Sequence, residues 1–208
     1  MSEKLIASIR HYNKNERVHH LEVFKKLSDI QKPDAIFIGC SDSRVMPNLF
    51  SYSEPGELFM VRNVGNFIPR SSMSGVADGD ESEAAAIEYG LEHLNIDDII
   101  VCGHSSCGAM QALHSGRNNI HAINLSKWLR HGDGALKFKR KLVVEDGLSE
   151  VDQLSQKNVL AQIENVKTYP IVIELLKANK LRLHAWWFNV ETASIYVFNE
   201  TTSQFELA

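Results

Sequence analysis

Three short apolar runs constrain the fold of this chain more than any other feature. They cover residues 35–38, 58–61 and 99–101, and each is continuously apolar rather than alternating. Such runs are typical of strands in a parallel sheet, because those strands are buried on both faces. A stripe of apolar residues at helical spacing lies between the last two runs, over residues 81–94. Strands that alternate with helices predict an α/β fold, with a mainly parallel central β-sheet flanked by helices.

The two ends of the chain extend this predicted core. Apolar residues recur three and four positions apart between Leu5 and Leu27, so residues 1–32 are expected to form an N-terminal helical arm. Apolar runs at 183–188 and 195–198 predict a C-terminal hairpin. The length of 208 residues suits one domain that covers residues 1–208. We also expect helices over residues 120–130, 154–166 and 170–179, and a loop over residues 71–80.

Composition and charge exclude several classes of function. The net charge of −4 offers no basic surface for nucleic acid or for an anionic membrane. No apolar stretch approaches the ~20 residues that span a bilayer, and the first residues lack the apolar core of a signal peptide. The three cysteines are odd in number, which argues against a disulfide framework. We therefore expect a cytoplasmic protein without nucleic-acid or membrane partners.

Two polar motifs follow the first and third apolar runs. They read Cys40-Ser41-Asp42-Ser43-Arg44 and His104-Ser105-Ser106-Cys107. Ligands of open α/β sheets collect at the carboxyl ends of strands, where both motifs are expected to lie. Two cysteines and one histidine suit a zinc ion whose fourth position stays open for chemistry. We predict Cys40, His104 and Cys107 as its ligands, and Cys102 as a buried structural cysteine.

Asp42 and Arg44 add a second chemical function to the first motif. They lie two positions apart, so in an extended segment their side chains point the same way and can pair. The pair can hold Asp42 off the metal, so that Asp42 orients a zinc-bound water. Alternatively, Asp42 itself is the fourth ligand of a closed site. Two thiolates cancel the charge of Zn²⁺, so we expect a raised water pKa and an activity that increases with pH.

The order and spacing of these residues resemble the β-class carbonic anhydrases. That family carries Cys-x-Asp-x-Arg and then His-x-x-Cys about sixty residues later, as this chain does. Further similar segments occur in the same order: Glu54–Phe59, Val61–Asn63, Ile87–Tyr89, Cys102–His104, Asn158–Val159 and His184–Trp186. The resemblance implies zinc-dependent, reversible hydration of CO₂ to bicarbonate and a proton, by attack of a zinc-bound hydroxide on CO₂. It also implies one Zn²⁺ per subunit.

The resemblance also assigns residues to the substrate. Gln31 matches a glutamine that contacts bicarbonate, and Phe59 and Tyr89 match aromatic residues of the CO₂ pocket. We add Gly108, because a glycine beside Cys107 lets the backbone come close to a ligand. The resemblance implies a homodimer or tetramer in which the N-terminal arm packs on a partner and the cleft is shared at the interface.

One subgroup of the family binds an inhibitory bicarbonate through a Trp, an Arg and a Tyr. This chain keeps Arg62, but Phe37 and Phe188 stand at the other two positions, which favours the open site. Two alternative functions stay open. One is a hydrolase of a CO₂ analogue, carbonyl sulfide or carbon disulfide, on the same fold. The other is a non-catalytic zinc-binding regulatory protein, which would have no use for Asp42, Arg44 and Gln31.

Overall fold

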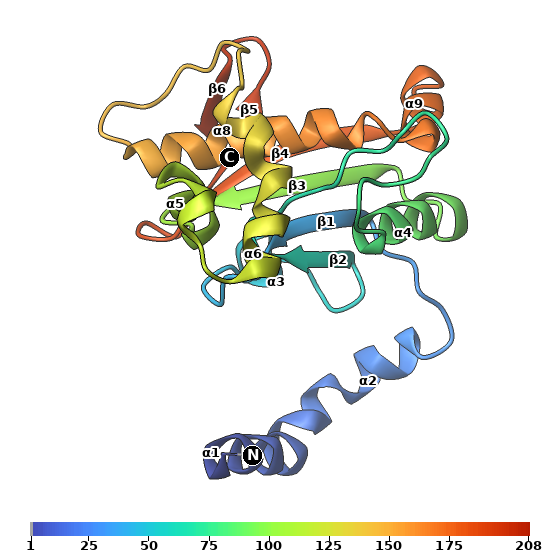
Figure 1. Cartoon of the computed structure of the whole chain (residues 1–208). Helices are drawn as coiled ribbons and strands as arrows, with labels where there is room; N and C mark the ends of the chain where they lie inside the picture. The colour runs from blue at the N-terminus through green and yellow to red at the C-terminus, as the bar shows by residue number, and fades with distance from the viewer. Residues whose placement is uncertain (1) are drawn as a thin grey trace.

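A six-stranded mixed sheet forms the centre of the molecule (Figure 1). The computed structural model describes residues 2–208, with the strands in the order β2-β1-β3-β4-β5-β6. The first four of these pair in parallel, and β5 and β6 are antiparallel additions. The strands are β1 (Ala35–Cys40), β2 (Leu58–Asn63), β3 (Asp98–His104), β4 (Arg182–Asn189), β5 (Ser194–Asn199) and β6 (Gln204–Leu207). The predicted α/β fold with a mainly parallel sheet is confirmed.

Helices form in all the segments where the sequence predicts them. The longest, α8, starts earlier than predicted because Ser149 caps it, its side chain accepting a hydrogen bond from the Asp152 N–H. No helix within residues 2–208 is long and apolar enough to cross a membrane. The helices are α1 (Glu3–His11), η1 (Tyr12–Glu16), α2 (Arg17–Leu27), α3 (Pro47–Phe50), α4 (Ser82–Glu88), η2 (Tyr89–His93), α5 (Gly108–His114), η3 (Arg117–Asn119), α6 (Ile123–Trp128), η4 (Leu129–Gly132), α7 (Asp133–Leu136), α8 (Glu150–Val166) and α9 (Pro170–Lys177).

The central strands are buried on both faces, which explains their continuous apolar runs. Ile36 and Ile38 of β1 point into a core that α4, α8 and α9 cover. Phe37 points to the opposite face, where it packs near Phe50 of α3 and Trp186 of β4. All six residues of β1 are buried. Each side chain of this strand therefore meets apolar surface, as expected of a central parallel strand.

The predicted C-terminal hairpin forms between β4 and β5, but it is only part of the arrangement. β4 also pairs in parallel with the whole length of β3, from Asp98 opposite Arg182 to His104 opposite Phe188. The third strand, β6, extends the sheet beyond the predicted hairpin and was not expected from the sequence. The hairpin is therefore joined to the parallel core rather than being a separate appendage.

The N-terminal arm consists of α1, η1 and α2, and it extends away from the sheet (Figure 1). None of its helices contains a buried residue, and Leu5, Ile9 and Phe24 are more than half exposed. The predicted helical arm is confirmed for residues 3–27, and residue 1 lies outside the described residues. Its packing on a partner stays a prediction, which this exposed apolar surface favours.

Candidate metal centre

Parallel strand register brings the two sequence motifs to one edge of the sheet. Cys40 is the last residue of β1, and His104 is the last residue of the neighbouring β3. Cys107 caps the start of α5, three residues after His104. The ligand atoms of these three buried residues all lie within 4.8 Å of one another. The cluster predicted from sequence is therefore assembled by the fold, and it has the composition of a metal site.

His104 is oriented for binding a metal ion. Its Nδ1 lies 2.8 Å from the carbonyl oxygen of Ser105, which can only accept, so Nδ1 carries the proton. The lone pair is then on Nε2, which is fully buried and has no hydrogen-bond partner among residues 2–208. Buried polar atoms rarely lack a partner. A metal ion bound to Nε2 and the two sulfurs would satisfy this atom, and would retain a fourth coordination position.

The two cysteines of the cluster affect one another electrostatically. A hydrogen bond from the Cys107 thiol, with smaller contributions from His104 and the Gly65 N–H, lowers the pKa of Cys40 below its usual range. The Cys40 sulfur and burial together raise the pKa of Cys107, although N–H groups at the start of α5 oppose this. A cation between the sulfurs would favour the thiolate of both residues. Burial raises the pKa of Cys102, which lies outside the cluster as predicted.

Asp42 and Arg44 form the predicted ion pair beside this cluster. The Arg44 Nε donates to Asp42 Oδ1 at 2.9 Å, and its Nη2 donates to Oδ2 at 2.7 Å. These bonds hold the pKa of Asp42 well below its usual range. Asp42 Oδ2 lies 3.9 Å from the free Nε2 of His104. The carboxylate therefore stands next to the metal-binding atoms with both oxygens already engaged by Arg44.

The backbone around this pair differs from the extended segment that the sequence predicted. The Val45 N–H donates to the Asp42 carbonyl, which closes a turn over residues 42–45. The Arg44 N–H also donates to Asp42 Oδ1 at 3.0 Å, so the carboxylate caps its own turn. The expectation of an extended backbone was wrong, but the side chains still meet. Arg62 supports the same turn by donating to the carbonyls of Cys40 and Asp42.

Three predicted substrate residues lie away from the metal cluster of their own chain. In the parallel pairing of β1 with β2, Asn63 lies opposite Cys40 and Phe59 lies opposite Ile36. Phe59 is therefore four residues, roughly 13 Å, from the end of β2 that lies beside the metal cluster. Tyr89 lies against Phe59, with ring centroids 5.8 Å apart. Gln31 precedes β1 and is exposed. Gly108, by contrast, follows Cys107 directly, and a Cβ there would meet open space.

Sequence reasoning missed a hydrogen-bond network that supports the Cys40 sulfur. The Asn63 side chain donates to the Phe67 carbonyl at 2.8 Å and accepts from the Phe67 N–H. This closes a loop whose Gly65 N–H donates to Cys40 Sγ at 3.4 Å. Asn63 also donates to Glu83, a buried carboxylate whose other oxygen lacks a partner among the described residues. No local motif in the sequence connects Glu83 to a loop twenty residues earlier.

Glu83→Gln is expected to stabilise the fold increasingly as the pH rises. Burial raises the pKa of Glu83 in the native state above its value in the unfolded chain. The contribution of Glu83 to the free energy of unfolding is therefore fully present below the unfolded pKa. That contribution is lost as the pH rises through the native pKa, whereas glutamine stays neutral throughout. Urea unfolding between about pH 4 and 8 measures the difference. The control, Glu81→Gln, changes an exposed carboxylate just before the same helix. A stability difference between Glu83→Gln and wild type that does not vary with pH would contradict the expectation.

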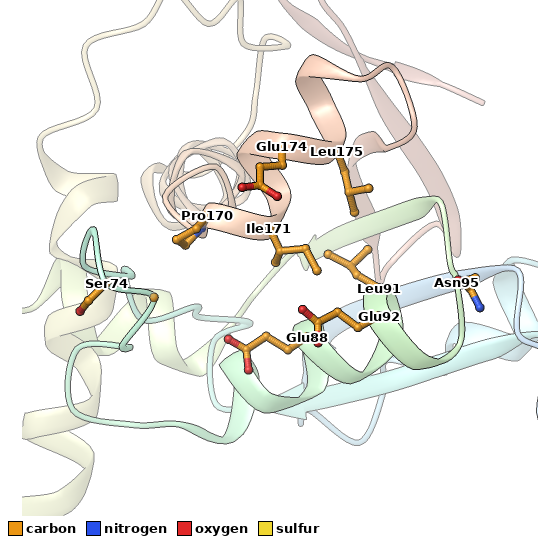
Figure 2. Close-up of a pocket in the computed structure, with 10 residues that line it drawn as sticks. Ser74, Glu88, Leu91, Glu92, Asn95, Pro170, Ile171, Glu174 and Leu175 are labelled. Carbon is orange, nitrogen blue, oxygen red and sulfur yellow. The ribbon is translucent and has the colours of Figure 1, made fainter.

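A separate surface cavity of about 610 Å³ lies between η2 and α9 (Figure 2). The carboxylates of Glu88, Glu92 and Glu174 line it together with apolar side chains such as Leu91. It contains none of the metal-binding residues and no positively charged side chain. The candidate metal cluster is thus separate from this cavity, at the carboxyl-terminal edge of the sheet.

Comparison with known proteins agrees with this geometry. A model of the family described as "Carbonic anhydrase" matches residues 35–195. The carbonic anhydrase of Synechococcus elongatus is 40% identical over 96% of this chain and 72% of its own length. The solved structure of the beta-carbonic anhydrase CcaA aligns with a TM-score of 0.85 and 33% identity, over 99% of this chain and 91% of that one. A tetrameric beta-carbonic anhydrase of Sordaria macrospora aligns with a TM-score of 0.71 and 26% identity, over 94% of this chain and 95% of that one.

The fold, a mainly parallel sheet with a Cys-His-Cys cluster at one edge, defines a class of α/β proteins with a candidate metal site. Within that class, the matched family covers most of the chain and contains all three residues of the cluster. The chain belongs to the β-carbonic anhydrase family.

Proposed function

We propose that this protein catalyses the reversible hydration of CO₂ to bicarbonate and a proton, with one zinc ion per subunit held by Cys40, His104 and Cys107. The observation that carries the proposal is the buried, unpartnered Nε2 of His104 beside two cysteine sulfurs. When bound, zinc would supply a Lewis acid that lowers the pKa of water below its bulk value and so makes it a nucleophile. This chain's own residues must then orient that water and leave room for CO₂.

Asp42 is the residue that we propose to orient the nucleophilic water. Its low pKa keeps it ionised at neutral pH, so it accepts a hydrogen bond and cannot donate one. Arg44 occupies both carboxylate oxygens, which supports an Asp42 directed beside the metal rather than bound to it. We therefore propose that the site is open at neutral pH, with Asp42 as fourth ligand only in a closed state.

The surroundings of Arg62 also favour the open site. Its guanidinium already donates to the main-chain carbonyls of Cys40 and Asp42. The side chains of Phe37 and Phe188 are buried and have no polar atom, and Phe50 stacks on Phe188 with ring centroids 4.7 Å apart. A bicarbonate at this position would lose its hydration without gaining hydrogen bonds from these rings, which costs free energy.

Gln31, Phe59 and Tyr89 are proposed to line the CO₂ pocket from a partner subunit. They lie toward the amino-terminal ends of β1 and β2, whereas Cys40 lies at the carboxyl-terminal end of β1, so one chain does not complete the site. Homo-oligomerisation is supported by the exposed apolar residues of the arm and by the tetrameric state of a homologue. Gly108 then borders the pocket from the same chain as the metal. A cytoplasmic location stays a prediction, favoured by three free cysteines.

Stopped-flow CO₂ hydration by the zinc-loaded wild type tests this function. The rate is expected to exceed the uncatalysed reaction and to rise between about pH 6 and 9. The reason is that two thiolates leave the site without net positive charge, which raises the pKa of the zinc-bound water. A zinc-loaded protein with no rate above background would identify a non-catalytic zinc protein. Faster turnover of carbonyl sulfide or carbon disulfide in parallel assays would instead identify a hydrolase of a CO₂ analogue.

A further inference from the structure

Ser106, between the metal-binding residues His104 and Cys107, has a strained backbone that is held at both ends. Its φ of 53° lies in the left-handed region, which is unfavourable for serine. The Ser106 N–H donates to Asp152 Oδ1 at 2.6 Å. The Ser106 carbonyl accepts from Arg44 Nη2 at 3.1 Å. One peptide segment thus connects a carboxylate on α8 to the guanidinium that binds Asp42.

Asp152 is itself rigidly oriented. It lies in the first turn of α8, and its Oδ2 accepts a hydrogen bond from the Ser149 hydroxyl at 2.8 Å. The same helix is fixed to β3, because Ser155 donates to the His104 carbonyl at 2.8 Å. The Asp152 carboxylate therefore accepts the Ser106 N–H, 46 residues away in sequence, from a helix that is hydrogen-bonded to β3.

Arg44 needs this second anchor because its side chain is 46% exposed. The ion pair with Asp42 links two residues of the same turn, and that turn alone leaves the guanidinium free to move with the carboxylate. The Ser106 carbonyl comes from the connection between β3 and α5, which follows His104 directly and leads into Cys107. It therefore ties the Asp42–Arg44 pair to the element that carries two of the metal-binding residues.

We propose that Asp152 is a positioning residue of the active site. By holding Ser106 in its left-handed conformation, it presents the Ser106 carbonyl to Arg44 and so keeps Asp42 directed at the open coordination position. Asp152 is not one of the cluster residues, and we assign it no contact with the substrate. The inference deepens the proposed CO₂ hydration and rests on it, because the orientation of Asp42 matters only if Asp42 assists that reaction.

Amide hydrogen exchange at Ser106 tests the structural half of this proposal without any turnover. We compare wild type, Asp152→Ala, Asp152→Asn and the control Glu150→Gln, which removes a charge from the same helical turn without contacting Ser106. In Asp152→Ala the Ser106 amide is expected to lose its protection, while amides within α8 keep theirs. Asparagine retains an oxygen acceptor, so Asp152→Asn is expected to preserve most of the protection.

Stopped-flow kinetics on the same four zinc-loaded proteins test the catalytic half. Asp152→Ala is expected to lower kcat for CO₂ hydration about tenfold with full zinc content, a typical effect of removing a residue outside the direct ligands. Asp152→Asn should recover most of the rate, and Glu150→Gln should equal wild type. KM should change little, because Asp152 does not contact CO₂.

Two results would overturn the proposal. One is an Asp152→Ala protein with unchanged Ser106 protection or unchanged kcat. The other is a loss of protection spread along α8, which would make Asp152 a helix cap and nothing more. The proposed function fails separately, on a wild type that does not hydrate CO₂. In that case the exchange experiment still decides whether Asp152 holds Ser106.

Discussion

Cys107→Ser is expected to lose bound zinc and to reduce CO₂ hydration to the uncatalysed rate. Cys107 supplies one of only two sulfurs in the cluster and is buried against Cys40 and His104. A serine hydroxyl does not ionise near neutral pH and is a poor zinc ligand, so the remaining pair would hold the ion weakly. Zinc content after dialysis, measured by plasma mass spectrometry, and stopped-flow hydration report the two losses.

Cys102→Ser is the matched control for this experiment. Cys102 is an equally buried free cysteine in the strand that ends at His104, but it lies outside the cluster. The control is expected to keep its zinc and its rate, with at most a modest loss of stability from a buried hydroxyl. Retention of one zinc per subunit by Cys107→Ser, or loss of zinc by Cys102→Ser, would refute the assigned ligand set.

Asp42→Asn is expected to lower the hydration rate about 100-fold while zinc remains bound. This factor is at the lower end of the range for loss of a general acid or base. The amide preserves the size of the side chain and one oxygen. It removes the charge that keeps Asp42 a pure acceptor and that pairs with Arg44 at 2.7 Å. Stopped-flow rates and zinc content, measured on the same preparation, separate a catalytic effect from loss of the metal.

Ser43→Ala provides the control, because Ser43 is an exposed residue in the same turn between Asp42 and Arg44. It is expected to leave both the rate and the zinc content unchanged. A fully active Asp42→Asn would mean that Asp42 neither orients the water nor needs its charge. Loss of zinc from Asp42→Asn would instead indicate that Asp42 is a metal ligand and that the site is closed.

The core of the fold and the metal cluster could be predicted because their signals are local. A continuous apolar run predicts a strand buried on both faces, and β1 and β3 form where such runs occur. Parallel pairing then brings the carboxyl ends of both strands to one edge, so Cys40 and His104 meet without further information. The pairing of Asp42 with Arg44 could also be predicted from the sequence, since oppositely charged side chains so close in sequence can reach each other in several backbone conformations.

The remaining features depend on contacts between distant segments. Asp152 looks like an ordinary residue of a helix start, and only the packing of α8 on β3 brings it to Ser106. Glu83 lies in an amphipathic helix, and its burial against Asn63 is decided by how α4 meets the end of β2. β6 is a four-residue strand whose pairing with β5 could not be distinguished from a loop.

Residue types and their spacing were enough to predict three features: the candidate sulfur and imidazole ligands, the neighbouring ion pair and the parallel sheet that brings them together. Contacts between distant segments were needed to show how the Asp42 carboxylate is oriented and that the Ser106 carbonyl holds its partner Arg44. The tertiary structure also placed Phe59 four residues along β2 from the end that pairs with Cys40, with Tyr89 against it, so both lie away from the metal cluster of their own chain. These features differ in predictability because strand register and helix packing depend on many contacts between distant residues, whereas ligand type and ion pairing are properties of short segments.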